Sequence, residues 1–549
     1  MTAALSAHIM GAKNVLVIEK DRMYGGTSAM SGGGVWVPCN RYAIEADATD
    51  SLEEAFQYLR ETTPEDETSD EMLMAYLKAA PEMVNFLHEH TDVRYESLGA
   101  YPDYFSDAGG AKSGHRSMEP SPISTTKLGD VFRDQTPPNP MVKVFGRLHF
   151  TQQELHYLMG RLPGWKSIVM KEAVKYAVDL PMRVRGSQTR RLTMGAAGVA
   201  RLRLSMIKRN IPLWLNTKLV DLVYENGRVV GAKIEKEGRP QFIPVSKAVI
   251  LASGGFEHNQ ALREQHLPEP TNAEWSGGSR CNTGDALQAA GMIGAASRLM
   301  SNAWWSTTIS VPGETYPRMS IFEKSLPGNF VVDALGNRVA NESQNYMMFM
   351  RALHKEHGNG GSPAPYYMIF DERHRKNYIV GPLLPGKMWP DFLIPKKYFE
   401  DRFLTKAESI SELASCIGVD QSGLAATIGK VNAYAKTGKD LDFHRGEALH
   451  DRYYSDPTVK PNPCLAPVLR PPFYAMKIDP GDIGTQGGIA IDKNAQVLRE
   501  DASPIQGLYA AGNCAAGILT TYPGPGSTLG PAMTFAYLAA KHITGQGSS

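Results

Sequence analysis

A tyrosine in a rigid turn stands ahead of the last apolar helix of the chain, where an anionic oxygen could bind. Tyr522 opens the sequence Tyr-Pro-Gly-Pro-Gly at 522–526, in which proline restricts the backbone and glycine permits close approach. A helix is expected to begin near Gly530 and Pro531, because proline at a first helical position loses no hydrogen bond. The first turn of a helix exposes N–H groups that favour negative charge. The turn could therefore fix the Tyr522 ring and the Gly526 N–H beside a ligand; the alternative is an ordinary connection.

Two short strands could position such a ligand. Leu508–Ala511 is an apolar run that ends at Gly512 and leads into the turn. Val15–Ile18 is a continuous apolar run suited to a strand buried on both faces, and it stops at Glu19. An acidic side chain at the tip of the second strand of a dinucleotide-binding unit accepts hydrogen bonds from ribose hydroxyls. Glu19 is therefore a candidate nucleotide ligand.

A glycine-rich segment follows Glu19 and reads GGTSAMSGGG at 25–34, so that backbone N–H groups can approach a ligand closely. An acidic residue capping a strand before such a loop favours a nucleotide site over an unrelated loop. The G-x-G-x-x-G turn that cradles a pyrophosphate should precede Glu19. Residues 1–11 instead have the character of the first helix of that unit. We therefore expect the chain to begin inside its own nucleotide-binding motif. Either the start codon was assigned too late or this protein lacks the turn that binds the pyrophosphate.

Bulk composition excludes several function classes. The 549 residues suffice for two or more domains, and 58 basic against 57 acidic residues give no field that would concentrate nucleic acid. The five cysteines are scattered without a C-x-x-C pair, which argues against a metal site and favours a reducing compartment. No apolar run approaches the roughly 20 residues that span a bilayer. We expect a cytoplasmic protein with a neutral partner, and loose membrane association through an apolar entrance stays open.

Taken together, these features resemble the 3-ketosteroid Δ1-dehydrogenases, which belong to the flavoprotein superfamily of fumarate reductase and succinate dehydrogenase. The resemblance runs along almost the whole chain. Its glycine run and C-terminal strand are shared by the superfamily, whereas the Tyr-Pro-Gly-x-Gly turn and the distributed tyrosines are specific. The segments that carry it are the Glu19 strand, GGTSAMSGGGVWVP at 25–38, ILASGGF at 250–256, NESQNY at 341–346 and TYPGPGSTLGPAMTF at 521–535.

The resemblance implies an α/β fold in which a Rossmann-like FAD-binding domain of the glutathione-reductase-like kind carries an inserted α+β catalytic domain. Between about Met292 and Lys477 the composition changes to aromatics, prolines and scattered charge. We therefore expect the FAD-binding domain at 1–291 and 478–549, and the catalytic domain at 292–477. The family also implies a steroid 3-ketone between the domains and an external electron acceptor such as a quinone.

The chemistry of this family removes two hydrogens from adjacent carbons beside a ketone, with FAD as the hydride acceptor. Tyr522 and the N–H of Gly526 match the pair that polarises the carbonyl group. Tyr346 matches the tyrosine that takes the proton from carbon 2. Because an unperturbed tyrosine has a pKa of about 10, this base needs a neighbour that stabilises its phenolate. Tyr104 matches that assisting tyrosine, although Tyr101 lies in the same loop.

FAD contacts are implied for a larger set of residues along the chain. Because the turn that binds the pyrophosphate is missing, we expect this chain to bind FAD weakly or not at all. Trp304 and Trp305 could line a steroid cleft, although a buried tryptophan pair more often belongs to the core. The implied cofactor residues are Glu19, Gly25, Gly26, Thr27, Ser28, Ser31, Gly32, Gly33, Gly34, Gly254, Gly255, Asn513 and Leu529.

Two alternatives differ in class. The first is a flavin enoyl reductase of the fumarate reductase type, in which an Asn-Arg-Leu-Gly turn supplies an arginine that delivers the proton. Here the corresponding residues are Ser-Thr-Leu-Gly at 527–530, and Thr528 cannot replace an arginine or pair with a carboxylate. This difference favours a neutral ketone over a dicarboxylate. The second alternative is a non-catalytic remnant that no longer holds FAD.

Overall fold

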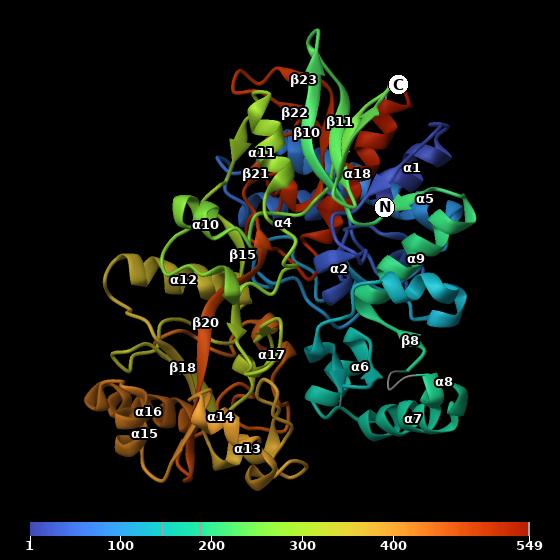
Figure 1. Cartoon of the computed structure of the whole chain (residues 1–549). Helices are drawn as coiled ribbons and strands as arrows, with labels where there is room; N and C mark the ends of the chain where they lie inside the picture. Colours follow the sequence, from blue (N-terminus) through green and yellow to red (C-terminus); the bar gives the residue numbers. More distant parts are fainter. Residues whose placement is uncertain (145, 186–188, 547–549) are drawn as a thin grey trace.

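The computed structural model describes residues 1–144, 146–185 and 189–546. Figure 1 shows an upper lobe, which holds both chain ends, and a lower lobe, with a small group of helices beside it. The upper lobe is built from the first and last parts of the chain, and the lower lobe from an inserted segment. This mixed helix and sheet architecture agrees with the expected fold class.

The upper lobe contains a six-stranded sheet in the order β10-β11-β23-β13, which β12 and β22 extend. Its centre, β23 (Pro504–Ala510), pairs in parallel with β13 (Val249–Leu251), which brings distant segments together. In the sequence, the pair Asn226 and Gly227 predicts a hairpin turn, and the chain does turn there, with φ angles of 51° and 80° that suit these two residue types. The other strands are β10 (Thr217–Glu225), β11 (Arg228–Lys236), β12 (Arg239–Pro244) and β22 (Gln496–Leu498).

The strand expected at Val15–Ile18 is shorter and less buried than predicted. Only Val17–Ile18 forms β1, which pairs in parallel with β9 (Leu213–Trp214), and both residues of β1 are half-buried. The prediction of burial on both faces was wrong, because β1 and β9 form a two-stranded sheet apart from the six-stranded one. The helix predicted within residues 1–11 is confirmed as α1 (Thr2–Ile9), which packs against α18 (Leu529–Ile543).

The other helices of the upper lobe cover these strands. The stretch from Leu52 to His90 is rich in helix formers, which predicts two helices. Two helices form there, each with a serine side chain capping its first turn. The short helix after the glycine pair at 25–26 packs against the helix that starts at Met194. These elements are α2 (Gly26–Met30), α3 (Arg41–Ile44), α4 (Leu52–Thr62), α5 (Asp70–His90), α9 (Met194–Lys208), α10 (Gln260–His266) and α11 (Asp285–Met292).

The lower lobe is built on an antiparallel sheet in the order β16-β15-β20-β18-β17, in which β16 (Arg318–Met319) is an edge strand and β19 (Leu404–Ala407) also pairs with β20. The long strand β20 (Phe473–Thr485) runs through the whole sheet, so the predicted boundary between residues 477 and 478 falls inside a strand. Helix α12 (Tyr346–Gly358) packs against β15 (Ala303–Ile309). The other elements include β17 (Asn329–Val332), β18 (Tyr366–Asp371), α13 (Glu372–Asn377), α15 (Ile410–Ile417), α16 (Gln421–Thr437) and α17 (Leu449–Tyr453).

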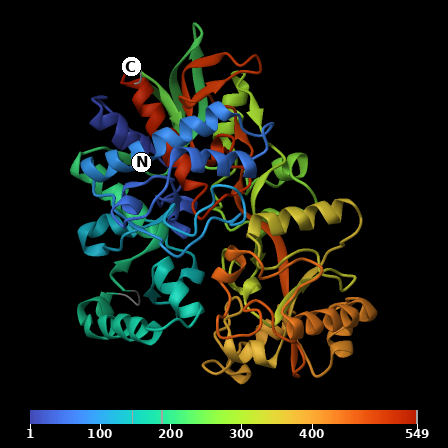
Figure 2. The ribbon, with the colours of Figure 1, turned by 180° about the vertical axis from the view of Figure 1, so that it is seen from behind.

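Three further helices project beside the lower lobe, and the view from behind in Figure 2 shows the same separation. They are α6 (Gln152–Met159), α7 (Trp165–Val178) and α8 (Leu180–Arg185). The His156 ring of α6 stacks on the Tyr453 ring of α17 with centroids 4.0 Å apart, which connects this arm to the lower lobe. Among the described residues no helix is both long and apolar enough to cross a membrane.

Candidate active site

The Tyr522 turn is held in an unusual backbone conformation. Tyr522 has a φ of 60°, in the left-handed region that non-glycine residues rarely adopt. The carbonyl oxygen of Pro523 accepts hydrogen bonds from the Tyr104 N–H at 2.8 Å and the Tyr58 hydroxyl at 2.5 Å. Gly526 has a φ of 105°, which only glycine adopts easily. Such strain persists only where surrounding contacts enforce it, so the Tyr522 ring has a fixed direction.

The three predicted catalytic tyrosines meet in the protein interior. The ring centroids of Tyr346 and Tyr522 are 5.3 Å apart, and the Tyr104 ring lies 6.0 Å from Tyr346 and 5.7 Å from Tyr522. Each side chain is at most 6% exposed. They come from the loop after β3 (Tyr95–Ser97), the first turn of α12 and the turn before α18. The structure therefore brings these three predicted residues to one place.

Burial sets the ionisation of this cluster. It raises the pKa of Tyr346 well above the ordinary value, and the neighbouring hydroxyl groups of Tyr104 and Tyr522 raise it further. Burial also raises the pKa of Tyr104 and, to a lesser degree, that of Tyr522. For Tyr522 the rise in pKa is partly offset by hydrogen bonds with Tyr346, Thr528 and the Gly526 N–H. The hydrogen bond between Tyr346 and Tyr104 lowers the pKa of Tyr104 and raises that of Tyr346, so the two hydroxyl groups titrate as a coupled pair.

The cluster continues through Tyr101, which the sequence places in the same loop as Tyr104, to two groups that sequence reasoning did not foresee, Tyr454 and His450. The Tyr101 hydroxyl lies 3.2 Å from that of Tyr104 and 2.6 Å from that of Tyr454. The His450 ring lies 4.5 Å from the Tyr104 ring, and burial lowers the pKa of His450 to about 3. Both Tyr454 and His450 belong to the region of α17, whose sequence carries no recognisable motif. Only their polar and aromatic character was visible in the sequence.

A cavity lies at the start of α18 and is connected to the tyrosines through Trp304. It is lined by Trp304, Asn513 and Thr528 among others, and the Trp304 ring lies 5.6 Å from the Tyr522 ring. The Trp304 indole N–H donates to the Asn513 side-chain oxygen at 3.1 Å. Thr528 precedes the first turn of α18 without capping it. Within that turn the Gly530 N–H donates to the Gly526 carbonyl oxygen at 2.9 Å and Pro531 has no N–H, so an anionic group at this end would meet the N–H of Leu529. Trp305 instead packs against His354 in the protein core, which is the alternative to a position in a steroid cleft.

Comparison with known proteins assigns the chain to a family. A family model described as an FAD binding domain matches residues 1–529. The chain is 38% identical over 559 residues to a 3-oxosteroid 1-dehydrogenase of Mycobacterium tuberculosis, covering all of this chain and 96% of that protein. It is 34% identical to a 4-oxocyclohexanecarboxylate 2-dehydrogenase of Sinomonas cyclohexanicum, over 100% and 91% of the two chains.

The crystal structure of a 3-ketosteroid Δ1-dehydrogenase from Sterolibacterium denitrificans, in complex with 1,4-androstadiene-3,17-dione, is also similar. It has a TM-score of 0.96 and 42% sequence identity, over 99% of this chain and 97% of that one. The chain belongs to the 3-ketosteroid Δ1-dehydrogenase family. The resemblance seen in the sequence is thereby confirmed, and the protein is an FAD-dependent oxidoreductase.

In this ketosteroid dehydrogenase family member, the residues near β1 fit a nucleotide. Glu19 ends β1, its carboxyl group accepts a hydrogen bond from the Asp21 N–H at 3.0 Å, and burial raises its pKa. The Thr27 hydroxyl accepts from the Ser279 N–H at 2.8 Å. Together with the cavity at α18, these groups could hold the ribose end and the ring end of FAD. The individual contacts of FAD stay a prediction.

The predicted cofactor glycines differ in what requires glycine at each position. A side chain at Gly33 would lie 2.3 Å from the Gly195 nitrogen, and one at Gly255 would lie 2.1 Å from the Thr485 hydroxyl oxygen. These two positions are required by packing of the protein on itself. A side chain at Gly26 would meet only Ser279 at 3.9 Å, so this backbone is open to a ligand. The expectation that the whole glycine run admits a ligand thus has direct support only at Gly26.

The remaining predicted cofactor residues lie in the same two regions. Ser31 donates to the Ser28 carbonyl oxygen at 2.9 Å, which shapes the end of α2, and Gly25 precedes that helix with a φ of 113°. A side chain at Gly254 would meet Asn282, whereas Gly32 and Gly34 both face Gln152. Leu529 is the first residue of α18 and follows the cavity residue Thr528.

Proposed function

We propose that this chain oxidises steroid 3-ketones by removing one hydrogen each from carbons 1 and 2. The observation that carries the proposal is the meeting of Tyr104, Tyr346 and Tyr522 beside a cavity at the start of α18. When bound, FAD supplies the acceptor for a hydride. The external electron acceptor that restores FAD would be a quinone or a similar carrier.

The ketone oxygen would bind between Tyr522 and Gly526. The Gly526 N–H lies close enough to the Tyr522 hydroxyl group to lower its pKa, so the two donors are neighbours and one ketone oxygen bound there could accept from both. Donors fixed before the reaction stabilise the negative charge that grows on the oxygen as carbon 2 loses its proton. The strained backbone of Tyr522 keeps its donor in place without reorganisation.

The proton from carbon 2 would go to the phenolate oxygen of Tyr346. The electron pair of the broken C–H bond moves into the ring as an enolate, whose charge Tyr522 and Gly526 hold. When carbon 1 then loses a hydride, that pair forms the bond between carbons 1 and 2 and the ketone is restored. Tyr346 thus acts as a general base, and Tyr104 shares its charge.

A dye-coupled assay tests this function. Loaded with FAD, the protein should reduce an artificial acceptor in the presence of androst-4-ene-3,17-dione or cholest-4-en-3-one, and the product should be the 1,4-diene. Fumarate and 4-oxocyclohexanecarboxylate are the two informative competitors, because both are anionic. Turnover of fumarate at a comparable rate, with no steroid oxidised, would reject the proposal in favour of an enoyl reductase.

Replacing Tyr104 by phenylalanine should cause a smaller loss than changing the base itself. We expect flavin reduction to slow by about tenfold, since a hydrogen bond to a charged group contributes about 1.5–3 kcal/mol. Because burial raises the pKa of Tyr346, the rate should rise with pH as its phenolate forms. Tyr104→Phe removes a hydroxyl group whose titration is coupled to that of Tyr346, so it should shift the pH at which the rate rises. Single-turnover flavin reduction measured across pH would show this. An unchanged profile would remove Tyr104 from the charge-sharing role.

We also propose that the arm of α7 and α8 rests on an anionic lipid bilayer, from which apolar steroids would enter. An apolar stripe with a spacing of four residues is exposed along α7, and basic side chains accompany it. Two further apolar residues extend this stripe onto α8. The exposed apolar residues are Met170, Val174, Val178, Leu180 and Val184, and the lysines of α7 are Lys166, Lys171 and Lys175.

Flotation with vesicles tests this surface. The protein should float with vesicles that contain phosphatidylglycerol and much less with phosphatidylcholine alone, because the lysines attract anionic headgroups. Val174→Glu together with Val178→Glu should abolish flotation and leave turnover of dissolved steroid unchanged. Val220→Glu, at an equally exposed valine on β10 of the upper lobe, is the matched control. Equal flotation of both variants would refute the assignment.

A further inference from the structure

The segment that leads into α12 is held at every residue. Asn341 donates to Asp451 at 2.8 Å, the Ser343 hydroxyl accepts from Arg445 at 3.0 Å, and the Asn345 side chain caps the helix by accepting from the Met348 N–H. Tyr346 is the next residue and the first of the helix. The position of the Tyr346 ring therefore depends on how this segment, 341–345, is fixed.

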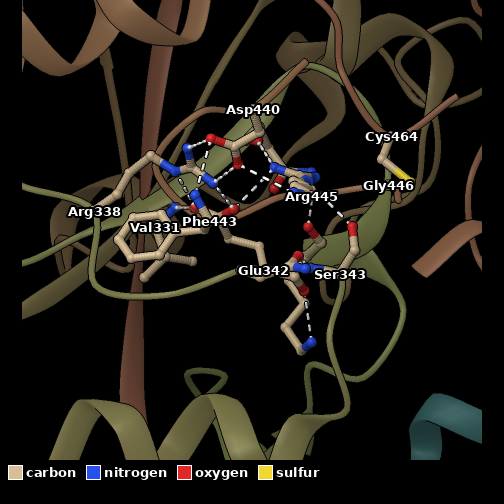
Figure 3. A network of polar contacts seen from close by, with 12 residues as sticks. Val331, Arg338, Glu342, Ser343, Asp440, Phe443, Arg445, Gly446 and Cys464 are labelled. Carbon is tan, nitrogen blue, oxygen red and sulfur yellow. Dashed lines mark hydrogen bonds and ion pairs between the residues drawn. The ribbon is translucent and has the colours of Figure 1, made fainter. Parts of the chain in front are cut away.

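A buried network anchors the same segment from its other side (Figure 3). Glu342 forms ion pairs with Arg338 at 2.7 Å and with Arg445 at 3.2 Å, and Arg338 also pairs with Asp440 at 2.8 Å. None of these side chains is more than 4% exposed. Every N–H direction of Arg445 meets an acceptor on Ser343, Glu342 or a backbone carbonyl group. This cluster makes the segment 341–345 rigid, and the N–H groups of Arg445 already have acceptors within the protein.

Lys324 meets that network through backbone carbonyl groups, and its own carbonyl oxygen accepts from Arg445 at 2.8 Å. Its ammonium group donates to the carbonyl oxygens of Glu342 at 2.6 Å and Gln344 at 2.7 Å, and it lies 5.4 Å from the Phe349 ring in the first turns of α12. The residue is 1% exposed. Within the described part of the chain, no carboxylate lies at ion-pair distance from it. Burying an ammonium group without a direct counter-ion is costly, which argues for a specific task.

The surroundings of Lys324 connect it to the tyrosine cluster. The charged groups that act on it are Asp451, Arg445, Glu342 and Glu323, and burial lowers its pKa to about 7. It in turn lowers the pKa of His450, whose ring contacts Tyr104. Lys324 therefore holds the segment that carries Tyr346 and acts on His450, whose ring contacts Tyr104.

We propose that Lys324 is a positioning residue for proton abstraction by Tyr346. Its two hydrogen bonds fix the carbonyl groups just before the helix, and thereby fix the Tyr346 hydroxyl relative to Tyr104 and carbon 2 of the steroid. This inference rests on the proposed function. A displacement of about 1 Å in a catalytic group can cost about a hundredfold in rate. Loss of Lys324 should consequently slow the removal of the proton and leave binding of FAD and steroid nearly unchanged.

Lys324→Met tests the proposal, because methionine keeps most of the length but has no donor. Flavin reduction by a 4-en-3-one steroid should slow by about 10- to 100-fold, with a half-saturating steroid concentration like that of the parent. The isotope effect of deuterium at carbon 2 should rise, and that at carbon 1 should fall, because proton removal becomes the slower step. In a Tyr346→Phe background, Lys324→Met should add no further loss, since the two residues act as one unit.

Lys406→Met is the matched control, because Lys406 is a partly exposed lysine of the same lobe paired with Asp391. It should behave as the parent.

Parental rates and isotope effects in Lys324→Met, or a full additional loss in the Tyr346→Phe background, would overturn the proposal. If Lys324→Met loses FAD, Lys324→Gln takes its place, because its amide group keeps a donor toward the same carbonyl oxygens. A smaller loss with the same isotope signature is then expected, and an unchanged signature would also overturn the proposal. A parent that oxidises no steroid would overturn the proposed function itself, and this inference with it.

Discussion

Tyr346→Phe should retain FAD but reduce its flavin with a 4-en-3-one steroid about a hundredfold or more slowly, because it removes the general base. Phenylalanine keeps the ring that packs 5.3 Å from Tyr522 and 6.0 Å from Tyr104, so the cluster should not collapse. Single-turnover absorbance of the flavin, recorded with saturating steroid, measures the chemical step directly. The parent rate should rise with pH because burial raises the pKa of Tyr346, whereas the variant should show little dependence.

The control for this variant is Tyr366→Phe. Tyr366 is a buried tyrosine on β18 of the same lobe, and its hydroxyl group donates to the Ser362 carbonyl oxygen at 3.0 Å. It should leave the rate of flavin reduction near the parental value. If Tyr346→Phe reduced its flavin at the parental rate, the proton would leave by another group and the proposed mechanism would be wrong. Combining Tyr346→Phe with Tyr104→Phe should cost clearly less than the product of both effects.

Local signals in the sequence predicted the elements that depend on local physics. The pair Asn226 and Gly227 adopts left-handed backbone conformations cheaply, so its hairpin formed where predicted. The start of α18 at Leu529 likewise follows from the turn and Pro531. The convergence of the tyrosines came from the family pattern and not from spacing, because residues more than 170 positions apart must meet through the fold of both lobes.

Features that depend on distant partners were not predictable in the same way. The burial of Val17 and Ile18 depends on which strands pair beside β1, and this pairing is set by contacts far along the chain. Gly33 appears in the sequence as a ligand-binding glycine, yet it faces the backbone of Gly195. Tyr454 joins the cluster through Tyr101, and no periodicity or motif marks it. Nor did the sequence reading identify the arm of α6–α8.

Tyr522→Phe should slow flavin reduction by about a hundredfold or more, for a reason different from that of Tyr346→Phe. It removes one of two donors to the developing oxyanion, and such a donor contributes about 2.7–4 kcal/mol. The Gly526 N–H would remain, so residual activity is expected. The ring of Tyr522 also packs against Trp304 at 5.6 Å, and phenylalanine keeps that contact. FAD content should therefore be unchanged.

Binding of an oxyanion mimic separates this role from that of the base. A steroid with an aromatic ring A carries a phenol oxygen where the enolate oxygen would form, so it should bind Tyr522→Phe much more weakly than the parent. Tyr346→Phe should bind it nearly normally, because Tyr346 meets carbon 2 and not the oxygen. Tyr509→Phe, in which a hydroxyl group 2.8 Å from His542 is lost in the upper lobe, is the control. A donor that stabilises the charge of the transition state must also favour binding of a stable molecule that mimics this charge. If Tyr522→Phe bound the aromatic steroid as tightly as the parent and reduced its flavin at a normal rate, the ketone would have to lie away from the Tyr522 turn.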